Sequence, residues 1–361
     1  MIRNIIFDWS GTLVDDLPAV WRASNHVFER AGVEPMSLED FRAEFALPFK
    51  PFYDHYTPHV PDEDREAWFH AHFPEVIHTI EDLPHARRFL EYCEERGFKV
   101  VLLSAIPQEQ FNFLAKRNGF DRFFHDHELG VRDKRERIHD VLERHAMKPE
   151  ETLFVGDMQH DVDAAKTGGV HSCATLTGYN TLSQLRESGP DLIVEHLGEL
   201  LEIFQRGGLA SKLKEDAGGQ GVMAGPVATV GGFVFNDADE ALFLKTHKWS
   251  GLWGMPGGKI KYGESSTDAF ARELKEETNL DCDGVSFIMT QDCVEPHEFY
   301  RKAHFVLLNF ACHVAGPADV KLNDEAREFR WMKLEESLKL SLNGPSERLV
   351  RRLLEDRNSQ L

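Results

Sequence analysis

The chain contains 361 residues, roughly twice the commonest size of a single domain, and this length predicts two domains. Hydrophobic residues make up 42% and charged residues 28%, a composition typical of soluble globular proteins. The formal net charge of −20 excludes a general electrostatic surface for a nucleic-acid polymer or an anionic membrane, so a phosphate group would have to be bound at a local site. No apolar run approaches the roughly 20 residues that span a bilayer, and Met1–Asp8 is too short to form a signal peptide. We therefore expect a cytoplasmic protein.

The first half of the chain alternates strand patterns with helix patterns. Apolar runs that each end in a polar or turn residue predict strands at Ile2–Phe7, Lys99–Leu103, Thr152–Val155, His171–Leu176 and Leu192–Val194. The rhythm is typical of βαβ units in a mostly parallel sheet that is covered on both faces. Between about residues 16 and 83 the alternation stops, and helix-like periods with Pro-rich turns predict a helical insertion after the first strand.

A glycine-rich polar stretch follows the last of these elements and predicts a linker over residues 205–224. Beyond it the pattern changes to an α+β layout. We expect a strand pair at Val227–Phe235 and Glu240–Leu244, a helix from about Ser266, further strands near Val285–Thr290, Ala303–His313 and Glu328–Lys333, and a closing helix from Pro345. The two domains should therefore cover residues 1–204 and 225–361.

The second half contains a spaced set of glycine and acidic residues. Gly258 and Glu264 precede a helical pattern in which Glu273, Glu276 and Glu277 lie at positions i, i+3 and i+4, and therefore on one face. Carboxylates that close repel one another unless a cation neutralises them, so this face suits a hard divalent ion. Such an ion would neutralise a diphosphate and acidify an attacking water.

This pattern resembles the Nudix box, G-x5-E-x7-R-E-U-x-E-E-x-G-U, where U is aliphatic. It departs from the box at Asn279, which stands where the family has glycine; asparagine is the usual second choice for the left-handed end of a helix. The resemblance implies an α/β/α sandwich that uses Mg²⁺ or Mn²⁺ to hydrolyse the pyrophosphate bond of a nucleoside diphosphate linked to a group X, as in a nucleotide sugar, a dinucleotide or a nucleoside triphosphate.

The same resemblance implies roles for individual residues. The implied metal ligands are Gly258, Glu273, Glu276 and Glu277, the catalytic residues are Glu273, Glu276 and Arg272, and the substrate-binding loop contains Gly257 and Gly258. Arg272 is offset to the neighbouring helix face, where we expect it to orient a glutamate. Glu325 and Glu328 precede the last strand, where some members carry the catalytic base, and plain loop acids are an equal alternative.

The first half contains a second motif, Asp8-Trp9-Ser10-Gly11-Thr12-Leu13, at the end of the first strand. It resembles the opening motif D-x-D-G-T-L of haloacid-dehalogenase-like (HAD) phosphatases, and the helical insertion fits the α-helical cap of that family. The resemblance implies that Asp8 attacks phosphorus and forms an aspartyl-phosphate. The further residues that it implies are Thr12, Ser104 and Lys134 for the phosphoryl group, and Asp8, Ser10 (through its carbonyl), Asp157 and Asp161 for Mg²⁺.

Ser10 replaces the second aspartate of the HAD motif, which normally protonates the leaving group. Three interpretations remain open: a substrate with a good leaving group or an acid recruited from the cap or the substrate, a resemblance to the phosphonate-cleaving branch in which a cap lysine forms a Schiff base, or phosphate binding without turnover. Lys50 lies in the insertion and is a candidate contact for an anionic substrate; a Schiff-base role and a solvated loop lysine are the alternatives.

The sequence thus predicts a Rossmann-like domain with a helical cap fused to a Nudix domain, α/β plus α+β, with Mg²⁺ or Mn²⁺ in both. The expected partners are small phosphorylated or nucleotide substrates, without a nucleic-acid polymer or a membrane, and homodimerisation is left open. The main hypothesis is a bifunctional hydrolase in which the HAD-like domain acts on a phosphomonoester, such as a product of the Nudix reaction. The alternatives are a Nudix hydrolase with a non-catalytic phosphate-sensing or dimerisation domain, and a Nudix domain that binds a ligand without hydrolysis.

Overall fold

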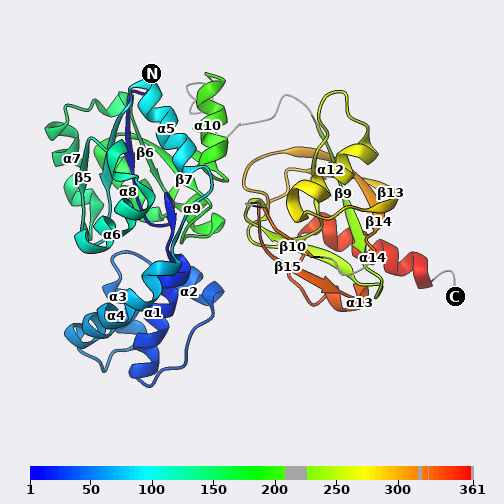
Figure 1. Cartoon of the computed structure of the whole chain (residues 1–361), viewed down its shortest axis with the longest axis horizontal. Helices are drawn as coiled ribbons and strands as arrows, with labels where there is room; N and C mark the ends of the chain where they lie inside the picture. The colour runs from blue at the N-terminus through cyan, green and yellow to red at the C-terminus, as the bar shows by residue number, and fades with distance from the viewer. Residues whose placement is uncertain (208–225, 316–318, 324, 359–361) are drawn as a thin grey trace. The chain divides into compact units, whose positions relative to one another are not determined.

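The computed structural model describes residues 1–207, 226–315, 319–323 and 325–358 (Figure 1). The chain divides into two compact units, Met1–Ala217 and Gly218–Leu361, and each is described by itself. The expected linker at 205–224 lies outside the described residues from residue 208 onward.

The first unit is built on a six-stranded parallel sheet with the strand order β5-β4-β1-β6-β7-β8. Its strands are β1 (Asn4–Phe7), β4 (Lys99–Leu103), β5 (Asp126–Glu128), β6 (Thr152–Gly156), β7 (His171–Thr175) and β8 (Leu192–Val194). The predicted parallel sheet is confirmed. The edge strand β5 was missed because its three residues are all polar and carry no apolar pattern.

Helices cover both faces of this sheet. They are α5 (Ala86–Arg96), α6 (Gln108–Asn118), α7 (Lys134–Arg144), α8 (Gln159–Gly168), α9 (Leu182–Ser188) and α10 (Leu197–Gln205), with short 3-10 turns at η2 (Asp121–Phe123) and η3 (Pro149–Glu151). Alternate residues of β1 point to opposite faces: Ile5 and Phe7 join one apolar core, and Ile6 joins the other. Two buried faces explain why the central strands β1 and β4 are nearly continuous apolar runs.

The helical insertion forms a cap between two short strands. β2 (Val14–Asp15) pairs antiparallel with β3 (Glu81–Asp82), and between them lie α1 (Leu17–Arg30), α2 (Leu38–Glu44), α3 (Lys50–Tyr56), α4 (Asp62–Val76) and η1 (Ile77–Thr79). Figure 1 shows α1 to α4 gathered beyond the end of β1. An aromatic cluster centred on Phe28, Phe41 and Phe52 holds the cap together and also contains Met158 and Tyr179 of the sheet domain.

Arg42 of the cap donates hydrogen bonds to the main-chain carbonyls of Leu176, Tyr179 and Asn180. The guanidinium therefore ties α2 to the loop that follows β7, and this loop belongs to the site described below.

The second unit contains a mixed sheet with the order β11-β10-β9-β14-β13, to which β12 adds beside β9 and β15 beside β10. The strands are β9 (Val227–Phe235), β10 (Ala241–Thr246), β11 (Trp253–Gly254), β12 (Gly257–Lys259), β13 (Asp283–Val294), β14 (His304–His313) and β15 (Ala326–Met332). The helices are α12 (Ser266–Thr278), α13 (Leu334–Ser337) and α14 (Gly344–Asn358), with η4 at His247–Trp249.

One apolar core packs α12 against the sheet, and a second core contains Leu349 and Val350 of α14. The predicted sandwich is thus present. The expected pair of β9 with β10 is limited to the register pair Ala241–Phe235. β14 is hydrogen-bonded along one edge of β9, in parallel, and β12 pairs with residues 229–231 on the edge that β10 shares. In the part of the chain that the structure describes, no helix has both the length and the apolar character needed to cross a bilayer.

Candidate active sites

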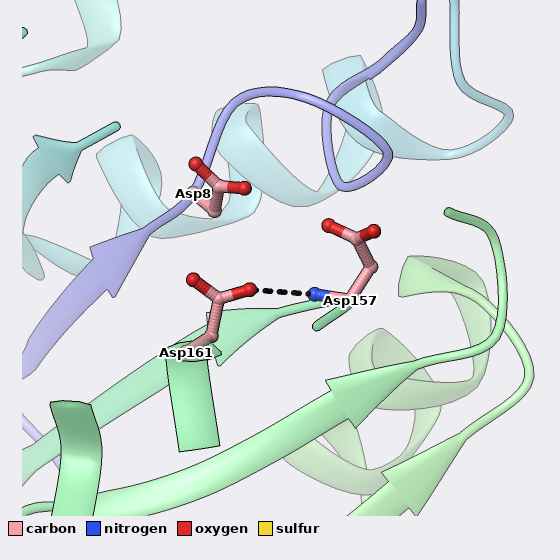
Figure 2. Close-up of side chains that lie close together, drawn as sticks. All are labelled: Asp8, Asp157 and Asp161. Carbon is pink, nitrogen blue, oxygen red and sulfur yellow. Dashed lines mark hydrogen bonds between the residues drawn. The ribbon is translucent and has the colours of Figure 1, made fainter. Parts of the chain in front are cut away.

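Three aspartates from separate elements meet at the carboxyl end of the parallel sheet (Figure 2). Asp8 directly follows β1, Asp157 directly follows β6, and Asp161 lies in the first turn of α8. One oxygen of each carboxylate lies within 4.8 Å of the others, and all three side chains are buried. Open α/β sheets bind ligands at this edge. The structure therefore brings together the three carboxylates that the sequence singled out.

A buried lysine links two of these carboxylates. The Nζ of Lys134, the first residue of α7, lies 2.8 Å from Oδ1 of Asp8 and 2.5 Å from Oδ1 of Asp161. Burial alone lowers the pKa of Lys134, but the neighbouring Asp161 and Asp8 outweigh it and raise that pKa above its usual value. The ammonium therefore stays charged, as a group that offsets phosphoryl charge must.

Hydrogen bonds from the backbone and from Thr12 fix Asp161 and Asp157. Oδ2 of Asp161 accepts from the backbone N–H groups of Asp157 (3.2 Å) and Met158 (3.0 Å). Asp157 accepts from the Thr12 hydroxyl at 3.0 Å and from the N–H of Tyr179 at 2.7 Å. Thr12 was expected to contact phosphoryl oxygens; it is fully buried, and its hydroxyl supports Asp157.

The loop after β7 approaches Asp157 too closely to carry a side chain. A Cβ at Gly178 would lie 1.9 Å from Oδ2 of Asp157, and a Cβ at Gly11 would lie 2.5 Å from the same oxygen. Gly11 also has a φ of +67°, in the left-handed region. The Asp157 side chain can therefore occupy this position only because residues 11 and 178 are glycines.

The buried charges of this site do not balance, because three carboxylates face one ammonium. Burial, and then repulsion by Asp161 and Asp8, raises the pKa of Asp157 well above its usual value. Burial also raises the pKa of Asp8, although Lys134 opposes it. Carboxylate oxygens are the ligands that Mg²⁺ prefers in proteins. The donor set and its excess negative charge therefore fit the expected metal.

A cavity of about 360 Å³ opens from Asp8 toward the cap helices. Ser10 and Ser104 line it beside Asp8, and the Ser104 hydroxyl forms a hydrogen bond with the Asp8 carboxylate. Ser104 therefore stands where it can also contact a group that is bound next to Asp8.

Lys50 lines the same cavity from the first residue of α3. Its Nζ lies 2.7 Å from Asp62 and 2.9 Å from Asp54, and hydrogen bonds to these two carboxylates raise the pKa of Lys50. A Schiff base forms from a neutral amine, whereas these ion pairs favour the ammonium. The geometry therefore opposes the Schiff-base alternative.

Asp16 is a residue of this site that the sequence reasoning missed. It is buried, lines the cavity with Asp8 and Ser10, and accepts hydrogen bonds from the Ser10 hydroxyl and, at 3.1 Å, from the Tyr179 hydroxyl. Burial raises the pKa of Asp16 to about 7 even though these hydrogen bonds oppose the shift. An aspartate directly before a helix is a common N-cap, so the sequence carries no signal that sets Asp16 apart; in the structure its side chain makes no cap hydrogen bond.

In the second unit, Arg272 organises the acidic helix α12. It donates to both oxygens of Glu264 at 2.7 and 2.9 Å, to Glu273 at 2.7 Å and to Glu276 at 3.0 Å. The pair with Arg272 lowers the pKa of Glu264 to about 2. Arg272 thus orients the carboxylates around it.

Glu277 is the most buried of the glutamates on α12. It accepts from the backbone N–H of Gly257 at 2.9 Å, and burial raises its pKa to about 8, with Lys248 opposing and Glu325 adding to the shift. Burial likewise raises the pKa of Glu273. Lys248 forms an ion pair with Glu325, and its charge opposes the rise in the pKa values of Glu273 and Glu277. The sequence did not single out this lysine.

The three glutamates of α12 were expected to hold divalent ions, and the structure does not place ligand atoms of all three within 4.8 Å of one another. Glu276 is about half exposed and forms ion pairs with Arg272 and with Lys261 at 3.2 Å, because these two cations flank it on the solvent side. Among the described residues, the aspartate cluster of the first unit is the acidic group whose ligand atoms all lie within 4.8 Å. The carboxylate oxygens of Glu273 and Glu277, together with the Gly258 carbonyl oxygen expected from the sequence, are of the kind that binds a divalent ion.

Strand β12, which precedes α12, packs closely on this helix, since a Cβ at Gly258 would lie 2.4 Å from the Glu273 carboxylate. Gly257 and Gly258 also line a pocket of about 140 Å³. Aromatic rings form another wall of this pocket, where the Phe299 ring lies 4.9 Å from the rings of both Trp249 and Phe305. Glu328, which was expected to precede the last strand together with Glu325, lies within β15; it is half exposed and 3.5 Å from Lys245.

Both units match known protein families. The model of the haloacid dehalogenase-like hydrolases matches residues 5–175, and the model of the NUDIX domain matches residues 225–353. A phosphoglycolate phosphatase from Vibrio parahaemolyticus is 27% identical over 218 residues, which cover 56% of this chain and 96% of that protein. The pyrophosphatase PpaX from Anoxybacillus flavithermus is 27% identical over 211 residues, which cover 56% of this chain and 97% of that protein.

Solved structures show the same fold for the first unit. The crystal structure of a predicted phosphatase from Clostridium acetobutylicum superposes with a TM-score of 0.52 at 17% identity, covering 57% of this chain and all of that one.

Proposed function

We propose that this chain, which joins a haloacid dehalogenase-like hydrolase domain to a NUDIX domain, carries out two successive hydrolyses. Its domains are those of a hydrolase with phosphatase-type and pyrophosphatase-type activity. In the proposed reactions, the NUDIX domain splits a nucleoside diphosphate linked to X, and the HAD-like domain removes phosphate from a product. The observation that carries the second step is the buried cluster of Asp8, Asp157 and Asp161 with Lys134 at the end of a cavity.

In the proposed phosphatase reaction, an oxygen of Asp8 attacks phosphorus, the bond from phosphorus to the ester oxygen breaks, and the alcohol leaves after taking up a proton. Lys134 and Ser104 hold the transferred group by charge and hydrogen bond. Water then cleaves the aspartyl-phosphate and regenerates the carboxylate. Asp8, Asp157 and Asp161 would hold Mg²⁺, which supplies charge neutralisation when bound.

The leaving alcohol needs a proton that Ser10 cannot supply at neutral pH. Asp16 is the carboxyl group that lines the cavity and forms a hydrogen bond with Ser10, so the Asp16–Ser10 pair stands in the place of the missing acid. Loss of such proton transfer typically lowers the rate by about 10² to 10⁴. The variant Asp16→Asn should therefore lose that factor in phosphate release, and Ser10→Asp in the same background should restore part of it.

In the proposed NUDIX reaction, one water cleaves the pyrophosphate bond and yields a nucleoside monophosphate and a phosphorylated X. Glu273 and Glu277, with the Gly258 carbonyl, would hold Mg²⁺ or Mn²⁺, and Arg272 orients Glu273. For Glu276 to act in the site as well, it must leave its exposed ion pairs.

The test uses the full-length protein with Mg²⁺ and two panels: nucleoside diphosphate sugars, dinucleotides and nucleoside triphosphates in one, and phosphomonoesters in the other. Mass spectrometry identifies the products. We expect Glu273→Gln to abolish cleavage in the first panel alone and Asp8→Asn to abolish phosphate release in the second alone. Wild-type protein that cleaves neither panel would refute the proposal.

Ser10 keeps a second candidate open, in which the HAD-like domain binds phosphate without turnover. This candidate predicts no phosphate release from any monoester, unchanged NUDIX activity in Asp8→Asn, and measurable binding of phosphorylated ligands by titration calorimetry.

A further inference from the structure

The cavity above Asp8 has an apolar, aromatic wall that the proposed chemistry does not use. Its aromatic lining residues are Phe45, Phe49, Tyr53, Phe69, Phe73 and Tyr179, and most come from the cap. Several of these rings already pack on one another, such as Phe69 on Phe73 at 5.3 Å and Phe49 against Tyr53 at 6.2 Å. A volume of about 360 Å³ is within the range of pockets that enclose a whole small molecule.

The cations that line the cavity are balanced by acids. Arg65 and Lys50 share the carboxylates Asp54 and Asp62, with each of the four pairs at 2.7 to 3.1 Å, so that the cluster sums to zero. The remaining arginine, Arg132, is paired with Glu66 at 3.0 Å. A second anionic group on the substrate would therefore gain little here, and its desolvation would be costly.

One polar group of this wall still lacks a partner. Arg65 is 7% exposed, and its Nη1 has no hydrogen-bond partner, while its Nε donates to the carbonyl of Val60 and its Nη2 is held by Asp54. This Nη1 is itself shielded from solvent, so the Arg65 side chain must shift before a neutral acceptor, such as a carbonyl or ring nitrogen, on a molecule in the cavity can complete it.

We propose that the HAD-like site takes a phosphomonoester whose organic part is uncharged and bears a flat aromatic ring with a hydrogen-bond acceptor, namely a nucleoside 5′-monophosphate. This inference rests on the proposed function and selects between the two products of the NUDIX step. The ribose hydroxyls are common to a nucleoside 5′-monophosphate and to ribose 5-phosphate, so the base makes the difference: it presents ring faces to the aromatic side chains and acceptors to Arg65, which a sugar phosphate without a base does not. A small carboxylated ester such as phosphoglycolate would leave the aromatic wall uncovered, and its carboxylate would find no unbalanced cation among the lining residues.

The experiment compares nucleoside 5′-monophosphates with ribose 5-phosphate, which is the same ester without the base, and with 2-phosphoglycolate. We expect kcat/KM of full-length protein with Mg²⁺ to be at least about tenfold higher for a nucleoside monophosphate than for ribose 5-phosphate. Equal values, or a preference for 2-phosphoglycolate, would overturn the inference.

Cavity variants test the wall itself. Phe49 and Phe69 are half-buried, and Phe49→Ala and Phe69→Ala should lower this selectivity at least about threefold with little change for ribose 5-phosphate. Phe113 is an exposed phenylalanine that does not line the cavity, and Phe113→Ala is the matched control with unchanged selectivity. Equal selectivity in Phe49→Ala and Phe113→Ala would contradict the proposal.

A binding measurement separates this inference from the proposed function. Calorimetry with Asp8→Asn protein should give a Kd at least about tenfold lower for the nucleoside monophosphate than for ribose 5-phosphate. If this preference appears while wild-type protein releases no phosphate from any monoester, the phosphatase proposal fails and the ligand assignment stands. If turnover occurs without any preference for a base, the ligand assignment fails and the phosphatase proposal stands.

Discussion

The replacement Lys134→Met tests how the aspartate cluster is held together. Lys134 is 1% exposed and is the cation in ion-pair contact with Asp8 and Asp161. With Asp8, Asp157 and Asp161 all ionised, removal of Lys134 changes the charge of the cluster from −2 to −3. Breaking a buried ion pair by removing one partner typically costs 3–5 kcal/mol, since the remaining charge is left buried and uncompensated. We therefore expect the free energy of unfolding of the first unit to fall by about 3–5 kcal/mol.

The assay is hydrogen exchange of the β1 and β6 amides in full-length protein as a function of urea, which reports the unfolding of the first unit separately. Lys116→Met, at an exposed position on α6, is the matched control and should change stability by less than about 0.5 kcal/mol. Mg²⁺ should recover more stability in Lys134→Met than in wild-type protein, because a bound cation replaces the lost charge.

Removing one of the excess charges should also help. In the double variant Lys134→Met with Asp161→Asn, the local charge returns to −2, and at least about 1 kcal/mol of the loss should be recovered. A loss below about 1 kcal/mol in the single variant, or identical losses in the single and double variants, would refute the electrostatic account of this cluster.

Three further predictions concern the residues around the two sites. Gly178→Ala places a Cβ 1.9 Å from an Asp157 oxygen and should destabilise the first unit by about 1–3 kcal/mol and weaken Mg²⁺ binding in calorimetry; normal affinity would show that the loop yields easily. Arg42→Ala removes the donors to three carbonyls of the loop after β7, so exchange of the loop amides should accelerate while the β8 amides stay protected, and equal acceleration in both would point to general destabilisation. Arg272→Gln should lower kcat/KM of pyrophosphate cleavage about 10- to 100-fold and let the pKa of Glu264 rise from about 2, as followed by NMR; a pKa that stays at about 2 would contradict the role of the guanidinium.

The sequence alone predicted two domains, a parallel sheet in the first of them and a resemblance to two families, and the comparisons confirm both resemblances. These features are local in the chain: apolar runs of strand length, helical spacing of Glu273, Glu276 and Glu277, and the motif that starts at Asp8. The candidate site residues at the ends of parallel strands could also be placed together, because such ends share one edge of the sheet.

Tertiary structure decided which partner each side chain finds. Thr12 donates a hydrogen bond to Asp157, Ser10 forms a hydrogen bond with Asp16, and Glu276 forms an ion pair with Lys261. None of these contacts has a sequence signal, since hydrogen bonds and ion pairs depend on distances between atoms that chain spacing does not fix. The apolar cavity, too, exists only when the cap helices close over β1, because its wall is assembled from residues far apart in the chain.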